Sequence, residues 1–147
     1  MGYARGIGVQ TTIQSKVRFA GIALHSGQEA TLEVHPAAPD HGIVFERLDL
    51  DVLRVQRRVV VGPDALIEAT LCTRIGNGEG VTVSTIEHLM AALAGCGIHN
   101  ALITLDGPEV PILDGSSRPF VAAFVGAGIR DLAAPLTAIR VLRPVEV

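Results

Sequence analysis

The stretch Val83–Asn100 carries an acid and a histidine side by side, Glu87 and His88, at the start of a predicted helix. Imidazole is a common zinc ligand, because its neutral ring offers a nitrogen lone pair near physiological pH. A neighbouring carboxylate that does not itself bind the metal can act as general base on the attacking water. The pair therefore indicates metal-assisted hydrolysis as one interpretation.

Helix capping is the competing interpretation of the same glutamate. Ser84 precedes Glu87 by three residues, which is the spacing of a capping box with Ser84 as N-cap. A carboxylate in the first turn is also favoured by the helix dipole. Taken alone, Glu87 is better explained by capping.

His88 is harder to explain as part of an apolar interior. Residues at i, i+3, i+4 and i+7 form one apolar stripe of the helix: Ile86, Leu89, Met90 and Leu93. At about 100° per residue, His88 points nearly opposite this stripe. Its expected neighbours on the outer face are all small: Ser84, Ala91, Ala92 and Gly95. A solvated face usually carries long charged side chains, so we expect another layer of protein to pack against this one.

The spacing of the other histidines does not complete a metal site. Catalytic zinc has three protein ligands, and the chain contains neither H-E-x-x-H nor H-x-x-x-D. The remaining histidines fall in expected turns or strand ends and make no helical pair with His88: His25, His35, His41 and His99. On pattern alone, the chain does not contain a complete metal site.

The elements that must position this pair follow from hydrophobic periodicity and turn residues. The Asn77–Gly80 stretch predicts a hairpin. A second helix is predicted over residues 116–126, with Ser116 or Ser117 as cap and Pro119 in its first turn. Strands are predicted over residues 11–19, 29–36, 42–50, 54–61, 69–75, 81–84, 99–107 and 138–147.

This order of elements predicts an α+β fold. We expect a two-layer sandwich, in which a mostly antiparallel sheet of about five strands carries two helices on one face. Within residues 29–36, the alternation predicts that Ala30, Leu32 and Val34 share the face of the core.

Length and composition limit the class of protein. The chain has 147 residues, which fits one domain, and its 48% hydrophobic and 3% aromatic residues predict an aliphatic core. A net charge of -3 with few aromatic rings disfavours nucleic-acid binding. No apolar run approaches the roughly 18 residues of a membrane span, and the N-terminus lacks the apolar region of a signal peptide. Two separated cysteines, Cys72 and Cys96, predict a reduced, cytoplasmic protein.

The stretch from Ser84 to Val121 resembles the N-terminal half of the UDP-3-O-acyl-N-acetylglucosamine deacetylases, the zinc hydrolases of lipid A biosynthesis. The resemblance continues through Leu71–Ile75, Gly21–Gly27 and residues 138–147, so it covers nearly the whole chain. Several motifs in the same order are more specific than the Glu-His pair alone.

The resemblance implies roles for individual residues. Glu87 matches the catalytic general base, and His88 matches one zinc ligand. Leu71 and Cys72 match positions that line the site, and His25 matches a family histidine near it. The family has two similar α+β domains, packed helix layer to helix layer with the active site between them. A helix of the second domain would supply the remaining ligands, a His and an Asp four apart, and that domain would also supply a His that protonates the leaving amine.

The sequence departs from the family at one point, because it ends after the first domain. We therefore expect residues 1–147 to form a single N-terminal domain without the C-terminal catalytic half. The expected cofactor is zinc, the substrate UDP-3-O-acyl-N-acetylglucosamine and the partner the missing domain. The isolated chain should be inactive or nearly so, and its exposed helix layer should favour self-association. The alternative is a non-catalytic, stand-alone domain that serves as a binding or assembly module.

Two other clusters have structural interpretations. The Asp114–Ser116 stretch lies between a predicted strand and helix, which favours a turn and cap over a catalytic acid. Arg54, Arg57 and Arg58 form a small basic cluster, and a solvated strand edge explains it better than a diphosphate site.

Overall fold

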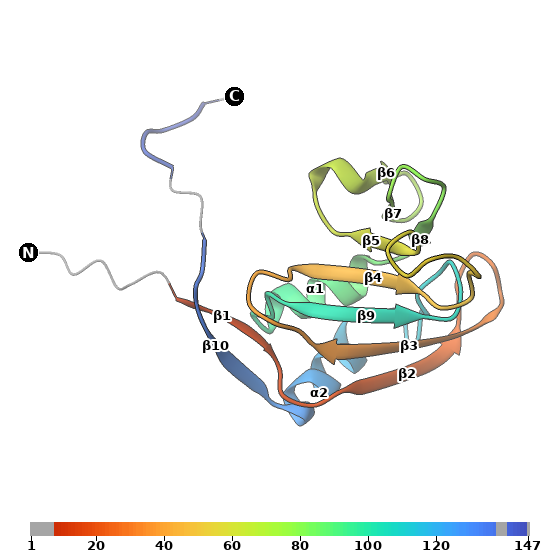
Figure 1. Ribbon diagram of the computed structural model, residues 1–147, viewed down its shortest axis with the longest axis horizontal. Coiled ribbons are helices and arrows are strands. Elements are labelled where there is room, and N and C mark those ends of the chain that lie inside the picture. Colours follow the sequence, from red (N-terminus) through yellow and green to blue (C-terminus); the bar gives the residue numbers. More distant parts are fainter. Residues whose placement is uncertain (1–7, 138–140, 147) are drawn as a thin grey trace, which may run out of the picture.

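The computed structural model describes residues 8–137 and 141–146. Within these residues the main sheet has the strand order β2-β3-β9-β4-β5 (Figure 1). Its neighbours pair antiparallel except β4 and β9, which run parallel. The predicted α+β class is therefore confirmed. The bounds of these strands are β2 (Val17–Ile22), β3 (Glu29–Pro36), β4 (Ile43–Arg47), β5 (Arg58–Val60) and β9 (Ala101–Leu105).

One face of this sheet is apolar and the other is polar. Ala30, Leu32 and Val34 of β3 are buried, as their alternation predicts. Leu32 pairs with Leu105 of β9, and Val34 pairs with Ile103, so the buried face continues across the sheet. The alternate residues of β3 lie on the opposite, polar face, where His35 Nε2 is 3.3 Å from Glu33 Oε2.

Both helices lie behind the main sheet in the view of Figure 1. Helix α1 (Glu87–Gly95) buries Leu89 and Leu93, and α2 (Arg118–Ala127) buries Phe120 and Phe124. The two rings of α2 pack against Phe19 of β2, with ring centroids 4.8 and 6.2 Å from it. Both predicted helices are confirmed, α2 lies within two residues of its predicted bounds at each end, and Pro119 sits in its first turn.

Two smaller sheets flank the main one. Strands β6, β7 and β8 form a three-stranded antiparallel sheet, and β1 pairs with β10 as a ribbon. The predicted hairpin at Asn77–Gly80 is confirmed, because the Asn77 amide donates to the Val81 carbonyl at 3.2 Å. The bounds are β1 (Val9–Ile13), η1 (Pro63–Ala65, a 3-10 turn), β6 (Leu66–Glu68), β7 (Arg74–Gly76), β8 (Thr82–Ser84) and β10 (Ile129–Pro135).

Two strand predictions at the ends of the chain are wrong. The predicted strand 11–19 is broken at residues 14–16, so that β1 and β2 belong to different sheets. The predicted last strand, 138–147, lies partly outside the described residues, and its described part, 141–146, is irregular. The partner of β1 is instead β10, where Ile13 pairs with Ile129. This pairing joins opposite ends of the sequence, so no local pattern reveals it.

Candidate active site

Helix α1 begins at Glu87, and the residues before it decide where its carboxylate lies. Strand β8 ends at Ser84, and Thr85 takes a φ of 60°, which is rare for a β-branched residue. Ile86 is the N-cap and makes no side-chain cap bond. The predicted capping box is therefore wrong, because Ser84 remains in the strand and Glu87 opens the helix instead of taking its third position.

The Glu87 carboxylate binds a neighbouring backbone amide instead. Its Oε2 atom accepts a hydrogen bond from the Thr73 amide at 3.0 Å. The Ile86 amide in turn donates to the Thr73 carbonyl at 3.4 Å. These two bonds fasten the segment before β7 to the start of α1.

That segment carries two of the predicted site residues. Leu71 is 80% exposed and Cys72 is half-buried. Both lie in a bend that precedes β7, whereas the sequence predicted a strand over residues 69–75. The structure thus brings Leu71 and Cys72 into the neighbourhood of Glu87, because Thr73, the next residue along the chain, holds its carboxylate.

His88 is half-buried in the first turn of α1. Its Nδ1 atom is buried and has no hydrogen-bond partner among the residues that the structure describes. The ring is therefore not committed to a structural hydrogen bond at that atom, which fits a side chain available to a ligand. Across residues 8–137 and 141–146, no three histidine, cysteine, aspartate or glutamate side chains gather where they could hold a metal ion. His88 alone could supply one ligand.

The outer face of α1 differs from the expected one at two positions, the first of which is Ser84, because it belongs to β8. Ala92 is completely buried in the core, although helical spacing placed it beside His88. The exposed small residues of the helix are Ala91, Ala94 and Gly95. The buried arc is wider than the four-residue stripe predicted, because α1 packs against both the sheet and α2. Apart from Glu87, helix α1 carries no charged side chain.

His25 lies in an exposed turn after β2, and a buried acid holds the backbone of that turn. Glu109 is only 4% exposed. One of its carboxylate oxygens accepts the His25 amide and the other accepts the Ser26 amide, both at 2.9 Å. The Thr85 hydroxyl donates to Oε1 at 2.9 Å. Burial would raise the pKa of Glu109, but hydrogen bonds from the His25 and Ser26 amides and from the Thr85 and Ser26 side chains together outweigh burial and lower this pKa below its usual range.

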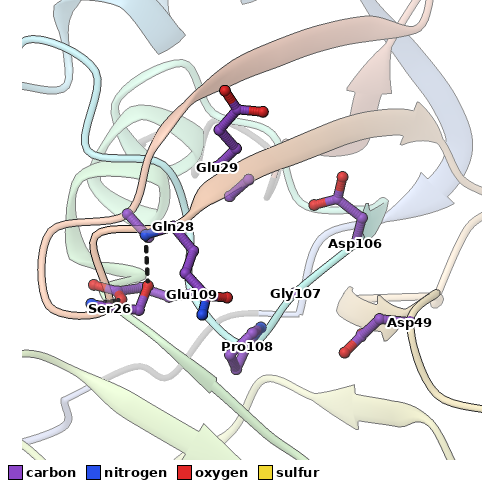
Figure 2. A pocket seen from close by; sticks show the side chains of 10 residues that line it. Ser26, Gln28, Glu29, Asp49, Asp106, Gly107, Pro108 and Glu109 are labelled. Atoms are coloured by element: carbon purple, nitrogen blue, oxygen red, sulfur yellow. Dashed lines mark hydrogen bonds between the residues drawn. The ribbon is translucent and has the colours of Figure 1, made fainter.

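Sequence reasoning missed Glu109. The residue stands in the Pro- and Gly-rich connection after β9, where no periodicity distinguishes a buried acid from a solvated one. Figure 2 shows Glu109 beside Ser26 in a pocket that Glu29 also lines, and the two remaining acids of the pocket, Asp49 and Asp106, lie away from Ser26. Those two acids are already engaged, because Asp49 pairs with Arg47 and Asp106 accepts a backbone amide.

Comparison with known sequences identifies the family. A family model described as UDP-3-O-acyl N-acetylglycosamine deacetylase, LpxC, matches residues 10–147. The chain belongs to this family. It is 49% identical over 138 residues to a UDP-3-O-acyl-N-acetylglucosamine deacetylase of Phenylobacterium zucineum, 46% identical to one of Shewanella baltica and 45% identical to one of Shewanella sp. strain ANA-3. Each match covers 94% of this chain but only 44–46% of the relative. The chain therefore spans less than half the length of the LpxC relatives that it matches.

The basic cluster of this LpxC-family chain differs from its predicted role. Glu46 of β4 is 2% exposed, and three guanidinium groups bind its carboxylate. The closest nitrogen–oxygen distances are 3.0 Å for Arg54, 2.9 Å for Arg57 and 2.9 Å for Arg58. The prediction of a merely solvated strand edge is wrong, because these arginines neutralise a buried acid that lies eight or more residues earlier in the sequence.

The Asp114–Ser116 turn of this LpxC-family chain agrees with its structural interpretation. Asp114 Oδ1 accepts the Ser116 amide at 3.0 Å and the Ser116 hydroxyl at 2.8 Å. Ser116 Oγ then accepts the Arg118 amide at 3.2 Å, at the start of α2. Ser117 occupies the N-cap position but makes no side-chain cap bond.

In the described part of this LpxC-family chain, none of the helices is long and apolar enough to cross a membrane.

Proposed function

We propose that this chain is the first half of a zinc-dependent amidohydrolase that removes the N-acetyl group from UDP-3-O-acyl-N-acetylglucosamine in lipid A biosynthesis. The observation that carries the proposal is the start of α1. There Glu87 and His88 lie together, and Glu87 holds the segment that contains Cys72. Membership of the LpxC family supports it.

Glu87 is the proposed general base. Its Oε2 atom accepts the Thr73 amide, which fixes the direction of the carboxylate and leaves Oε1 for the attacking water. Glu87 takes the proton of that water as the water attacks the N-acetyl carbonyl. The products are acetate and the free sugar amine, and the resemblance assigns protonation of this amine to a histidine of the second half.

His88 is the proposed metal ligand of this half. A ring whose Nδ1 makes no structural hydrogen bond fits this role. A zinc ion held there would supply positive charge beside the reacting carbonyl and make hydroxide available near neutral pH. The remaining ligands, a His and an Asp four residues apart, are proposed to come from the second half.

The substrate contacts proposed for this half are Leu71, Cys72 and His25. Leu71 and His25 are exposed, and Cys72 is half-buried beside Glu87, so substrate can reach all three. Cys72 and Cys96 are free thiols, which supports a reducing compartment and a cytoplasmic location. We also propose that residues 1–147 form one N-terminal domain.

Deacetylation tests the proposal in a polypeptide of the relatives' full length that begins with this chain. We expect release of acetate from UDP-3-O-acyl-N-acetylglucosamine, lost on addition of a chelator and reduced about 100-fold or more by Glu87→Gln, since general bases typically contribute this much. Glu79→Gln, an exposed acid in the β7–β8 turn, is the matched control and should retain activity. Turnover that survives Glu87→Gln would contradict the assignment.

Zinc affinity of the 147-residue chain tests the ligand count. One histidine supplies too few ligands for tight binding, so calorimetric titration should show weak binding that His88→Ala removes. His41→Ala, which changes a half-buried histidine of a distant loop, is the control. Tight binding, or chelator-sensitive turnover by this chain alone, would show that the site does not depend on a second half.

A further inference from the structure

We infer that Glu109 is a positioning residue, whose buried carboxylate holds the His25 turn in a fixed place relative to the start of α1. The inference deepens the proposed function and rests on it in one respect. The turn matters to the reaction only if His25 and the Glu87-His88 pair face the same substrate.

The carboxylate joins two parts of the chain that are distant in sequence. Oε1 accepts the His25 amide and the Thr85 hydroxyl, and Oε2 accepts the Ser26 amide, all at 2.9 Å. Both carboxylate oxygens therefore accept hydrogen bonds, and the three donors come from two separate segments of the chain. A carboxylate meets this demand because each ionised oxygen accepts hydrogen bonds, whereas an amide side chain offers a single acceptor oxygen.

The backbone of Glu109 is itself fixed to β8. The Ser84 amide donates to the Pro108 carbonyl at 2.9 Å, and the Val110 amide donates to the Ser84 carbonyl at 3.1 Å. The acid therefore projects from a strand-like segment that is rigidly attached just before α1. Its carboxylate links the exposed His25 turn to this fixed part of the backbone.

Thr85 is the link between the acid and the catalytic helix. It has a φ of 60° and is 3% exposed, so an unusual backbone conformation is held in the interior just before Glu87. The hydroxyl bond to Glu109 stabilises that conformation. One carboxylate thus fixes both the bend that leads into α1 and the turn that carries His25.

The base of the turn has other anchors, so the role of Glu109 is local. The Gly27 amide donates to the Ala23 carbonyl at 3.0 Å, and the Ile112 amide donates to the Ile22 carbonyl at 2.9 Å. These bonds remain when Glu109 is replaced. Removal of the acid should release the His25 and Ser26 amides and leave the strands on either side intact.

Amide hydrogen exchange of the 147-residue chain, followed by NMR, tests this directly. Glu109→Gln should accelerate exchange of the His25 and Ser26 amides by about tenfold or more, because the population of open turn rises. The Gly27 amide and the amides of β3 should keep their rates. Glu29→Gln removes the same charge from the same pocket (Figure 2), without a bond to the turn, and should change nothing at His25.

Two results would overturn the inference: unchanged protection of His25 and Ser26, or acceleration spread equally over β3 and β9. A second variant serves if Glu109→Gln fails to fold. Ser26→Pro removes one donor from the exposed turn and leaves the interior untouched. It should accelerate exchange at the neighbouring His25 amide, and an unchanged His25 rate would count against the positioning role.

A double-mutant cycle separates positioning from general stability in the full-length polypeptide. Glu109→Gln and His25→Ala should each lower kcat/KM, and the double variant should lose less than the product of the two single losses, because part of the effect of Glu109 passes through the His25 turn. Losses that multiply would show a purely structural effect and refute the inference. If the unsubstituted polypeptide has no deacetylase activity, the proposed function fails, while the exchange rates still decide the role of Glu109.

Discussion

Individual carboxylates of this chain have different roles, which depend on the hydrogen-bond donors around them. Glu87 accepts a bond from the Thr73 amide, Glu109 has both oxygens bound by neutral donors, and Glu46 is surrounded by guanidinium groups. The sequence identified Glu87 because its neighbour is a histidine. Glu46 and Glu109 could not be found in the same way, since their partners come from other segments and nothing local marks them as buried.

Replacement of Glu46 should be the most destabilising of the conservative changes at acids. Glu46→Gln leaves three guanidinium groups around a neutral amide, and loss of one partner of a buried ion pair costs about 3 kcal/mol. Glu33→Gln is the control, because the Lys16–Glu33 pair is exposed and contributes less than about 1 kcal/mol. Urea denaturation at neutral pH measures both, and equal losses would contradict this reading of Glu46.

Acid should destabilise the fold through the same carboxylates. Burial would raise the pKa of Glu46, but hydrogen bonds from the three arginines outweigh it and lower the pKa below the ordinary 4.5. A lowered folded-state pKa gives stability that is present above 4.5 and is lost as pH falls through the folded value. The free energy of unfolding should therefore fall as the pH drops below this point. Glu46→Gln should make that fall shallower, and an unchanged slope would exclude Glu46 as a cause.

Helices of this chain were predicted more accurately than its strands. The apolar stripe of α1 and the Pro119 position of α2 are local signals, and both survive in the structure. The pairing of β1 with β10 is not local, and neither is the separation of β1 from β2. The prediction of a capping box is wrong because Thr85 has a positive φ, which the residue types do not reveal.

The buried side of α1 can be tested with two neighbouring alanines. Ala92 is fully buried, so Ala92→Leu should overpack the core and lower the free energy of unfolding by about 1–3 kcal/mol. Ala91 is exposed, so Ala91→Leu should change it by less than about 0.5 kcal/mol. Thermal and urea unfolding of the two variants provide the comparison. Similar stabilities would mean that the helix is rotated from the orientation described.

The whole molecule presents an apolar surface on its helix layer. Its exposed members lie on both helices: Ala91, Ala94, Ala122 and Val125. The relatives that this chain matches are about twice as long as the chain. The order of the elements predicted the class of fold. Composition predicted an aliphatic core, and most of the core is aliphatic, but all four phenylalanines are also buried in it. The sequence did not predict which residues of α1 stay exposed, because this depends on the rotation of the helix about its axis. Ala92, which was expected on the outer face, is buried.

Self-association is the expected behaviour of the chain on its own. Val125 is 66% exposed on α2, and contact between apolar helix surfaces of two copies would remove it from water. Sedimentation equilibrium should show concentration-dependent dimers or larger species, and Val125→Glu should shift them toward monomer. Val60→Glu, at an equally exposed valine of β5, should have little effect. A strict monomer at every concentration would contradict this expectation.

The ribbon of β1 and β10 decides where the polypeptide enters and leaves the fold. The Leu136 amide donates to the Gly8 carbonyl at 2.8 Å, so the first and last residues of the ribbon are bonded neighbours. Within the described residues, Gly8 and Leu136 therefore lie at the same corner of the fold. A circularly permuted form, with these two points joined and new ends opened in an exposed turn, would keep the order of the main sheet intact.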